Sequence, residues 1–453
     1  MTKRTVVARG ALAVRLADLS TEERVALERG LRMRNPSFSR GATSEERANE
    51  WLPMWRIQKD FFIAPRESLA VVRDVLGDVT VDDRTSEGDK APLVLRTALR
   101  DYQIEATKEL ATHRSGLLVV PTGGGKTVVG CAIAAHHGRA TLVLAPTADL
   151  VTQWANAATE HLGVEAGVLR GGKATLRPFS VATPQTALKH LDALAGRFGL
   201  LLVDEAHRAA APTYLEILFR FDARYRYGMT ATPKRADGLE SFVTAHLGPA
   251  LASVNRPDLE DAGHLERPVF VTVPTDFTFA YAGPTDWPRL LDALFIDDAR
   301  NQLLVDTIAR ECRDGATGLV LTARVEHAKQ LAASLIVAGL RAAALTGDMP
   351  AALRSSTLDR ARRGELDVVT ATSLADEGLD LPRISRLFLV APGKAESRLI
   401  QRVGRVLRPH PKKGAPIVFD FVDVRSGVLA NQARKRDLVF AEHWAAADPP
   451  VVA

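Results

Sequence analysis

Seven residues at 121–127, Pro-Thr-Gly-Gly-Gly-Lys-Thr, have the composition of a loop that binds the phosphates of a nucleotide. They follow an apolar run at 116–120 and precede a helical segment at 128–135. Glycines let backbone N–H groups surround phosphate oxygens, and the start of a helix attracts negative charge. Lys126 would reach the β- and γ-phosphates, and the Thr127 hydroxyl would coordinate Mg²⁺. The candidate phosphate-binding residues are Thr122, Gly123, Gly124, Gly125, Lys126 and Thr127.

The loop departs from the general motif at one position. The motif has a glycine five residues before Gly125, and this chain has Val120 there. A glycine-rich turn with an incidental lysine is the alternative. The Gly-Lys-Thr ending between a strand and a helix favours the phosphate site.

A pair of carboxylates follows another apolar run. Residues 200–203, Leu-Leu-Leu-Val, lead directly into Asp204-Glu205-Ala206-His207. At the carboxyl end of a core strand, Asp204 would face the phosphate loop and hold Mg²⁺, directly or through water. Glu205 would orient the attacking water. The same residues could instead begin a helix, but together with the phosphate loop they predict nucleotide hydrolysis.

Two blocks of alternating strands and helices must position these residues. In each block a short apolar run precedes a turn and a segment of helix length, which is typical of strands buried in a parallel sheet. The runs are 116–120, 141–145, 179–182, 200–203 and 225–229 in the first block, and 318–321, 342–345, 367–370, 387–390 and 416–421 in the second. The predicted fold class is α/β, with two tandem parallel-sheet domains and a small N-terminal α/β accessory domain.

The chain is expected to divide into four segments. These are an accessory domain at 1–90, a first parallel-sheet domain at 91–248, a connector at 249–288 and a second parallel-sheet domain at 289–453. A polar run at 82–90 indicates a linker, and the connector is richer in Pro and Gly.

The composition is that of an ordinary globular protein, with 46% hydrophobic and 25% charged residues. It excludes a chain that is mainly disordered, collagen-like or coiled coil. The two cysteines, Cys131 and Cys312, cannot form a disulfide framework or a four-cysteine zinc site. We find no signal peptide and no apolar run long enough to span a membrane, so a cytoplasmic protein is expected. The net charge of +5 is compatible with a polyanionic partner.

Asp204-Glu205-Ala206-His207, with the glycine-rich loop upstream, resembles the signature of superfamily 2 helicases and translocases. Further segments resemble the other motifs of that family in their usual order, and these are 99–103, 144–147 with 153–154, 181–185, 228–233, 345–347, 372–382 and 401–408. The resemblance implies two RecA-like domains with ATP bound between them and nucleic acid crossing both.

The resemblance also implies a role for each matching residue. The catalytic residues would be Lys126, Asp204, Glu205, Gln401, Arg405 and Arg408. Besides the phosphate loop, the nucleotide would contact Arg100, Gln103, Asp204, Gly378 and Asp380. Nucleic acid would contact Pro146, Thr147, Thr183, Thr346, Gly347 and Thr372, and hydrolysis would be coupled to movement by His207, Thr230 and Thr232.

Arg405 and Arg408 would act as arginine fingers. A planar guanidinium can clamp the charge that the γ-phosphate gathers in the transition state, and fingers from the second domain would make hydrolysis depend on domain closure. An arginine-rich helix could otherwise be a solvated face. The threonines suit a phosphate backbone, although any one could only cap a helix. We expect Trp154 to pack in the core or lend its indole N–H rather than stack on a base, and His207 to form a coupling hydrogen bond across the domain cleft.

Details of the motifs resemble a branch that acts on DNA. Thr230-Ala231-Thr232 and the segment 232–240 are similar to XPB-like proteins, phage recombination helicases and restriction motors, although Arg235-Ala236-Asp237 lacks the middle acid of their Arg-Glu-Asp. Segments 35–38 and 62–66 resemble the N-terminal domain of the same group. That domain would recognise nucleic acid or dock a protein partner, or would act as a structural brace.

We therefore predict an ATP- and Mg²⁺-dependent DNA helicase or translocase with a monomeric core, acting on single-stranded, forked or duplex DNA and on no membrane. The XPB-like resemblance implies travel from 3′ to 5′. The alternatives are a motor that moves on duplex DNA without unwinding it, an RNA helicase, and a scaffold that binds nucleotide without hydrolysing it. The scaffold would require the loss of a catalytic residue, and Lys126, Asp204, Glu205 and Arg405 are all present. DNA repair, recombination, restriction and phage defence remain open as settings.

Overall fold

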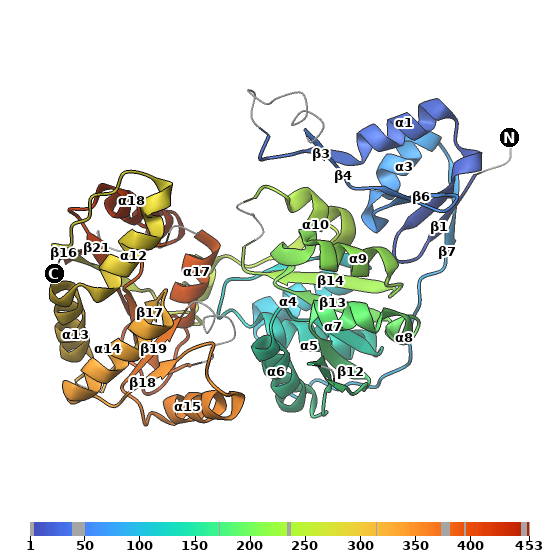
Figure 1. Cartoon of the computed structure of the whole chain (residues 1–453). Helices are drawn as coiled ribbons and strands as arrows, with labels where there is room; N and C mark the ends of the chain where they lie inside the picture. Colours follow the sequence, from blue (N-terminus) through green and yellow to red (C-terminus); the bar gives the residue numbers. More distant parts are fainter. Residues whose placement is uncertain are drawn as a thin grey trace. The chain divides into compact units, whose positions relative to one another are not determined.

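The computed structural model describes residues 4–38, 50–171, 173–232, 237–313, 315–372, 381–393, 396–444 and 451–452. For residues 173, 351, 396–398, 401, 405, 451 and 452 it describes the backbone alone. Contacts divide the chain into two compact units (Figure 1). The first unit contains 1–121 and 125–255, and the second contains 122–124 and 256–453.

The first unit begins with a small mixed sheet in the order β5-β6-β2-β1-β7. Its pairs are antiparallel except β1 with β7. Two helices, α1 (Thr21–Gly30) and α3 (Leu69–Leu76), cover an apolar core that contains Val6, Val14, Leu27 and Phe62. The strands of the sheet are β1 (Arg4–Ala8), β2 (Leu12–Arg15), β5 (Arg56–Gln58), β6 (Phe61–Ala64) and β7 (Val79–Asp83), and a separate ribbon pairs β3 (Arg32–Arg34) with β4 (Trp51–Pro53).

The same unit contains the first large sheet, in the order β11-β10-β12-β9-β13-β14-β8-β15. All its pairs are parallel except β10 with β11. The strands are β8 (Ser115–Val119), β9 (Thr141–Leu144), β10 (Gly167–Arg170), β11 (Lys173–Ala174), β12 (Phe179–Ala182), β13 (Leu200–Asp204), β14 (Tyr225–Thr230) and β15 (Ala250–Ser253). The helices are α4 (Asp101–Ala111), α5 (Lys126–His137), α6 (Ala148–Ala157), α7 (Pro184–Lys189), α8 (Leu191–Leu194), α9 (Pro212–Arg220) and α10 (Glu240–Leu247).

The second unit contains a parallel sheet in the order β18-β19-β17-β20-β21-β16-β22. The strands are β16 (Val269–Thr275), β17 (Thr317–Thr322), β18 (Ala342–Leu345), β19 (Val368–Thr372), β20 (Ile384–Leu389), β21 (Ile417–Asp423) and β22 (Val451–Val452). The helices are α11 (Arg256–Asp261), α12 (Trp287–Ile296), α13 (Asp298–Cys312), α14 (Val325–Val337), α15 (Ala351–Arg363), α17 (Glu396–Arg405) and α18 (Gly427–Trp444).

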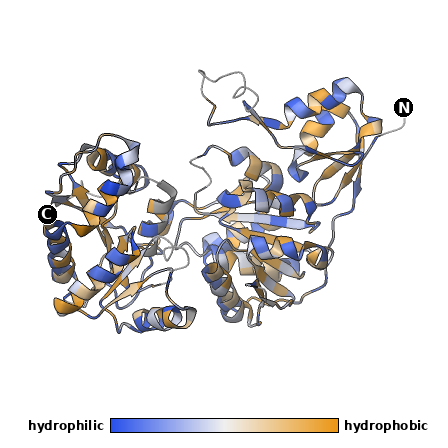
Figure 2. Ribbon diagram, viewed as in Figure 1, coloured by the Kyte–Doolittle hydropathy of each residue, from blue (hydrophilic) through white to orange (hydrophobic). Residues whose placement is uncertain are grey.

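The predicted fold class is confirmed, because each of the ten apolar runs coincides with a strand of a parallel sheet. In Figure 2 many strands of the two large sheets are hydrophobic, although β14 is not, whereas the helices carry both hydrophobic and hydrophilic residues. This distribution is expected when helices cover the faces of a parallel sheet. No helix among the described residues has the length and apolarity that crossing a bilayer requires.

Two segments expected between domains are parts of the sheets or lie against them. In the polar run 82–90, the Ser86 N–H donates to the carbonyl of Asp222 at 2.7 Å, and the Asp89 N–H donates to that of Arg197 at 2.8 Å. Residues 249–288 likewise supply β15 at the edge of the first large sheet and β16 inside the second. Both segments therefore bond to the folded units or form part of them, and are not free linkers.

The small mixed sheet is joined to the first large domain by two arginines. The buried guanidinium of Arg66 donates to the backbone carbonyls of Ala223, at 2.5 Å, and Arg224. Arg56 forms an ion pair with Glu216 of α9 at 2.5 Å, and its guanidinium lies 4.5 Å from the ring centroid of Phe219. These contacts fasten the accessory domain to the helix that follows the acidic strand end.

Candidate active site

The glycine-rich loop connects β8 to α5. Gly125 precedes the first helical residue, Lys126, and adopts a left-handed conformation with φ of 79°. Gly125 is the N-cap residue and has no side chain that could cap the helix. An uncapped helix start directs N–H groups and a partial positive charge toward an anion. The local geometry therefore fits a phosphate group held by Lys126, Thr127 and the loop backbone.

Gln103 of α4 packs against this loop. A Cβ atom at Gly125 would lie 2.4 Å from Gln103 Nε2, so a larger residue would displace the Gln103 amide, and the positive φ favours glycine in any case. The Gln103 side chain is buried, and its Oε1 accepts a hydrogen bond from the Arg100 N–H at 3.0 Å. The structure thus brings the predicted adenine-binding residues Arg100 and Gln103 next to the phosphate loop.

Asp204 ends β13 and is 6% exposed. Its Oδ2 accepts from the indole N–H of Trp154 at 2.8 Å, and its Oδ1 accepts from the Glu205 N–H at 2.9 Å. Burial raises the pKa of Asp204 to about 6, and the neighbouring Glu205 charge adds to the rise, whereas the Lys126 charge opposes it. The Lys126 charge lies close enough to lower the pKa of Asp204, so the loop lysine and the strand-end carboxylate belong to one site.

Trp154 is a core residue that orients this carboxylate. Its side chain is 1% exposed and packs against α5 at Gly130, where a Cβ would lie 2.6 Å from the indole ring. The expectation that Trp154 packs in the core and lends its N–H is confirmed. A ring this deeply buried has no face for stacking on a base.

Glu205, His207 and Thr230 connect the acidic strand end to the end of β14. Glu205 is a non-glycine residue with a positive φ of 48°, and its carboxylate lies 3.4 Å from His207 Nδ1. His207 Nδ1 is also 3.2 Å from Thr230 Oγ1, whose own proton is donated to the Thr232 carbonyl at 2.9 Å. His207 Nδ1 therefore donates to Thr230.

This pairing lies inside the first unit, and the expected bond from His207 across the domain cleft stays a prediction. The Thr232 Oγ1 is buried without a partner among the described residues, so this predicted coupling residue has unused hydrogen-bonding capacity beside the site.

The predicted nucleic-acid contacts of the first domain lie at one edge of its sheet. Pro146 and Thr147 follow β9, and Thr183 follows the adjacent parallel strand β12. Thr147 caps α6 by accepting from the Leu150 N–H at 3.3 Å, and Thr183 Oγ1 bonds Thr186 Oγ1 at 3.0 Å. Both threonines are partly exposed. Thr147 thus fulfils the capping role that was the alternative to a phosphate contact.

The corresponding residues of the second domain have the same placement. Thr346 and Gly347 follow β18, and Thr372 ends the adjacent strand β19. Thr346 donates to Asp348, while the buried Thr372 Oγ1 has no partner within the described part of the chain. Gly378 and Asp380 lie outside the described residues, as do the side chains of Gln401 and Arg405, whose backbone belongs to α17.

Lys413 is a site feature that the sequence did not predict. It is buried beside the segment that follows α17, and its Nζ donates to the carbonyls of Val406, at 2.5 Å, and Arg408, at 2.8 Å. The same Nζ forms an ion pair with Glu266 at 2.6 Å. Burial lowers the pKa of Lys413, and Glu266 opposes that change. Lys413 therefore fixes the backbone that carries the predicted finger Arg408.

Two families match the chain over these elements. The family described as "Type III restriction enzyme, res subunit" matches residues 96–235, and "Helicase conserved C-terminal domain" matches residues 299–410. Among curated relatives, the "DNA 3'-5' translocase XPB2" of Sulfurisphaera tokodaii is 26% identical over 74% of this chain and 84% of the relative. The "DNA 3'-5' helicase XPB" of Mycobacterium tuberculosis is 29% identical over 79% of this chain and 66% of the relative.

The chain belongs to superfamily 2 of the helicases. Within it, the chain falls in the group of XPB-like helicases and restriction-enzyme motors, as the motif details predicted. A solved structure with the same fold is "The fragment structure of a putative HsdR subunit of a type I restriction enzyme from Vibrio vulnificus YJ016", with a TM-score of 0.60, 19% identity, and coverage of 80% of this chain and 69% of that one. The family explains why the phosphate loop and the acidic strand end lie on neighbouring parts of one sheet.

Proposed function

We propose that this helicase is a DNA motor that hydrolyses ATP, moves from 3′ to 5′ and separates strands as it moves. The observation that carries the proposal is the joint placement of Lys126, Asp204 and Glu205 at the carboxyl edge of the first large sheet. The names of the XPB relatives support DNA as the track and 3′ to 5′ as the direction.

The residues of the first domain fit a nucleotide with Mg²⁺. Lys126 would bind the β- and γ-phosphate oxygens, and Gln103 would bind the adenine edge. Thr127 and Asp204 would hold Mg²⁺, which supplies charge neutralisation on the phosphates when bound. The fit rests on the start of α5, where Gly125 has no side chain for a cap, and on Asp204, whose two oxygens each accept one hydrogen bond from the described residues. Because a carboxylate oxygen can accept two, both retain capacity for the metal or its water.

Glu205 is placed to orient the attacking water. Its carboxylate lies 3.4 Å from His207, and that ring bonds Thr230 at the end of β14. A change in the position of Thr230–Thr232 would therefore move the His207 imidazole, and through it the Glu205 carboxylate. Arg405 and Arg408 would complete the site from α17 and the segment after it, and Gln401 would lie one turn earlier on that helix.

The accessory domain offers a second nucleic-acid contact. On its β3–β4 ribbon, the Arg32 guanidinium lies 4.2 Å from the ring centroid of Trp51, which is 41% exposed. Arg34 lies 5.8 Å from the ring centroid of Phe38 on the same ribbon. Arg34 is exposed and Arg32 partly exposed, and arginines beside aromatic rings suit single-stranded nucleic acid, because they combine positive charge with a stacking surface. The domain would thus contact DNA while Arg56 and Arg66 brace it against the motor.

A panel of nucleic-acid-dependent ATPase assays tests the proposal. Single-stranded, forked and duplex DNA should each be compared with RNA of the same sequence, and Glu205→Gln serves as the inactive control. We expect DNA to stimulate turnover more than RNA, and forked DNA to be unwound from the 3′ side. Stronger stimulation by RNA would favour an RNA helicase. Triplex displacement without strand displacement would favour a duplex translocase, and the absence of any turnover would favour a nucleotide-dependent scaffold.

A further inference from the structure

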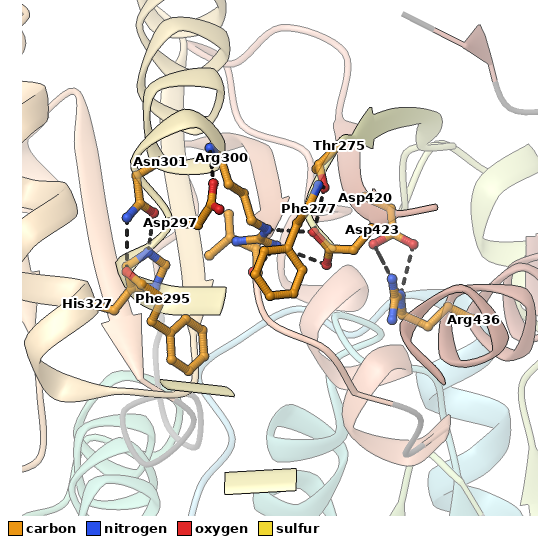
Figure 3. Close-up of polar contacts among 11 residues, drawn as sticks. Thr275, Phe277, Phe295, Asp297, Arg300, Asn301, His327, Asp420, Asp423 and Arg436 are labelled. Atoms are coloured by element: carbon orange, nitrogen blue, oxygen red, sulfur yellow. Dashed lines mark hydrogen bonds and ion pairs between the residues drawn. The ribbon is translucent and has the colours of Figure 1, made fainter. Parts of the chain in front are cut away.

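Two buried arginine–aspartate pairs lie at the carboxyl edge of the second large sheet (Figure 3). Arg300 of α13 donates to Asp423, the last residue of β21, with an Nε–Oδ1 distance of 2.7 Å. Arg436 of α18 forms two bonds of 2.8 Å to Asp420 of the same strand. The side chains are 1% and 4% exposed in the first pair and 7% and 5% in the second. Neither pair belongs to the predicted helicase motifs.

Each guanidinium also donates to a backbone carbonyl, and both carbonyls lie in one short segment. Arg300 Nη2 bonds the carbonyl of Val390 at 2.9 Å, and Arg436 Nη1 bonds that of Gly393 at 3.2 Å. The segment 390–393 follows β20 and leads toward α17, the helix that contains Arg405. Two arginines from different helices thus hold the two ends of the segment that precedes the finger helix.

The arginines are themselves held firmly. Asp423 also accepts from the Thr275 hydroxyl at 2.6 Å, and the Arg300 N–H is capped by Asp297 at 2.8 Å. Next to Arg300, Asn301 donates to the carbonyl of Phe295 at 2.9 Å, as Figure 3 shows. The network therefore ties the 390–393 segment to the ends of β16 and β21 and to the start of α13.

Stability alone does not account for these pairs. Removing two charges from water costs several kcal/mol per ion, and apolar residues of similar volume are often as stable as a buried ion pair. The cost is evident at Asp420, where burial raises the pKa of the carboxyl while Arg436 opposes that rise. A planar guanidinium can chelate a carboxylate through two N–H groups and donate to a carbonyl in a fixed direction, whereas an ammonium group has no such planar fork and an apolar residue has no donor. The arrangement is thus suited to fixing backbone position.

We propose that Arg300 and Arg436 are positioning residues that set the direction of α17 and hence the placement of the arginine fingers. This inference rests on the proposed ATP-hydrolysing function. The helix has ten residues, so it is about 15 Å long. A change of about 10° in its direction would displace its far end by roughly 3 Å. A displacement of about 1 Å can lower a reaction rate by about 10²-fold.

The test uses lysine substitutions, which retain the charge but lose the fork. We expect Arg436→Lys and Arg300→Lys each to lower the DNA-stimulated kcat by about tenfold or more. The KM for ATP and the affinity for single-stranded DNA should change by less than about twofold, because the phosphate loop and the strand-end threonines are untouched. The control is Arg341→Lys, since Arg341 pairs with Asp367 in the same unit and bonds no carbonyl of the 390–393 segment.

A double-mutant cycle separates positioning from general destabilisation. If Arg436 acts through the finger, Arg436→Lys should have little further effect on kcat once Arg405→Lys is present. Additive losses in the double variant, an unchanged kcat in both lysine variants, or loss of folding in both would overturn the inference. A failure of the proposed function is distinguishable, because Arg405→Lys alone would then leave the stimulated kcat unchanged.

Discussion

Replacing Asp204 with asparagine should change how the stability of the first unit depends on pH. Burial raises the pKa of Asp204 from 3.8 to about 6, with a further contribution from Glu205. Between these two values the folded chain keeps a proton that the unfolded chain has released. The free energy of unfolding therefore falls as the pH rises through this range and stays low above it.

The size of the effect follows from the two pKa values. A difference of about 2 units corresponds to about 3 kcal/mol at neutral pH. Between pH 5 and pH 7.5 the same values give a loss of about 1 kcal/mol for the wild-type chain. Asparagine does not titrate, so the free energy of unfolding of Asp204→Asn, relative to that of the wild type, should rise by that amount between pH 5 and pH 7.5. Asparagine replaces one of the two accepting oxygens with an NH2 group and so loses the bond from Trp154 or from the Glu205 N–H, but that loss is the same at both pH values and cancels.

The assay is urea unfolding of the first unit at pH 5 and pH 7.5, without nucleotide or divalent cations. Asp192→Asn is the control, because the Asp192 side chain is 96% exposed and should give no pH-dependent difference. The reasoning would be refuted if the difference between Asp204→Asn and the wild type were the same at both pH values, or were smaller at pH 7.5.

Three further predictions concern the same machinery. Glu205→Gln should bind ATP with near-wild-type affinity and lower kcat by about 10²-fold or more, since removing a positioned general base typically costs 10²–10⁴-fold; near-normal turnover would remove Glu205 from the catalytic role. Gly125→Ala should lose ATP binding and stability together, because a left-handed alanine costs roughly 1–2 kcal/mol and its Cβ would overlap Gln103. The control is Gly339→Ala, where φ is 92° and no atom lies near the added Cβ, so thermal unfolding should show the backbone strain alone. The logarithm of the affinity for single-stranded DNA should fall linearly with the logarithm of the salt concentration, with a slope near −0.7 per phosphate neutralised, and a flat response with strong base preference would contradict a backbone-dominated grip.

The sequence predicted those parts of the fold and site that depend on local pattern. Buried parallel strands read as continuous apolar runs, so the strands that carry Asp204 and Thr372 could be placed within a few residues. The glycine-rich loop could also be predicted from the sequence. The structure gives one physical reason for its composition, because Gly125 has a positive φ and lies against Gln103. Trp154 was expected to pack in the core or lend its indole N–H, but its bond to Asp204 is known only from the structure.

What the sequence did not predict depends on contacts between distant residues. Arg300 meets Asp423 across 123 positions of the chain, and Arg66 meets the carbonyl of Ala223 across 157. On a helix such arginines have the spacing of a solvated face, and only the tertiary fold shows that they are buried. The predicted connector 249–288 also contains a strand that its sequence did not indicate. Pro274 lies inside β16, and a proline usually argues against a strand.

The most direct test of the account is the DNA-stimulated turnover of Arg405→Lys measured beside its ATP affinity. The substitution keeps the positive charge but loses the planar fork that would clamp the transferring phosphate. We predict that ATP binding is nearly unchanged and that stimulated hydrolysis falls by roughly 10²-fold or more, given the size of arginine-finger effects. Lys126→Ala, which should abolish turnover, sets the background. If Arg405→Lys changes neither quantity, or weakens ATP binding as much as turnover, closure of the second domain on the nucleotide is not the step that drives hydrolysis.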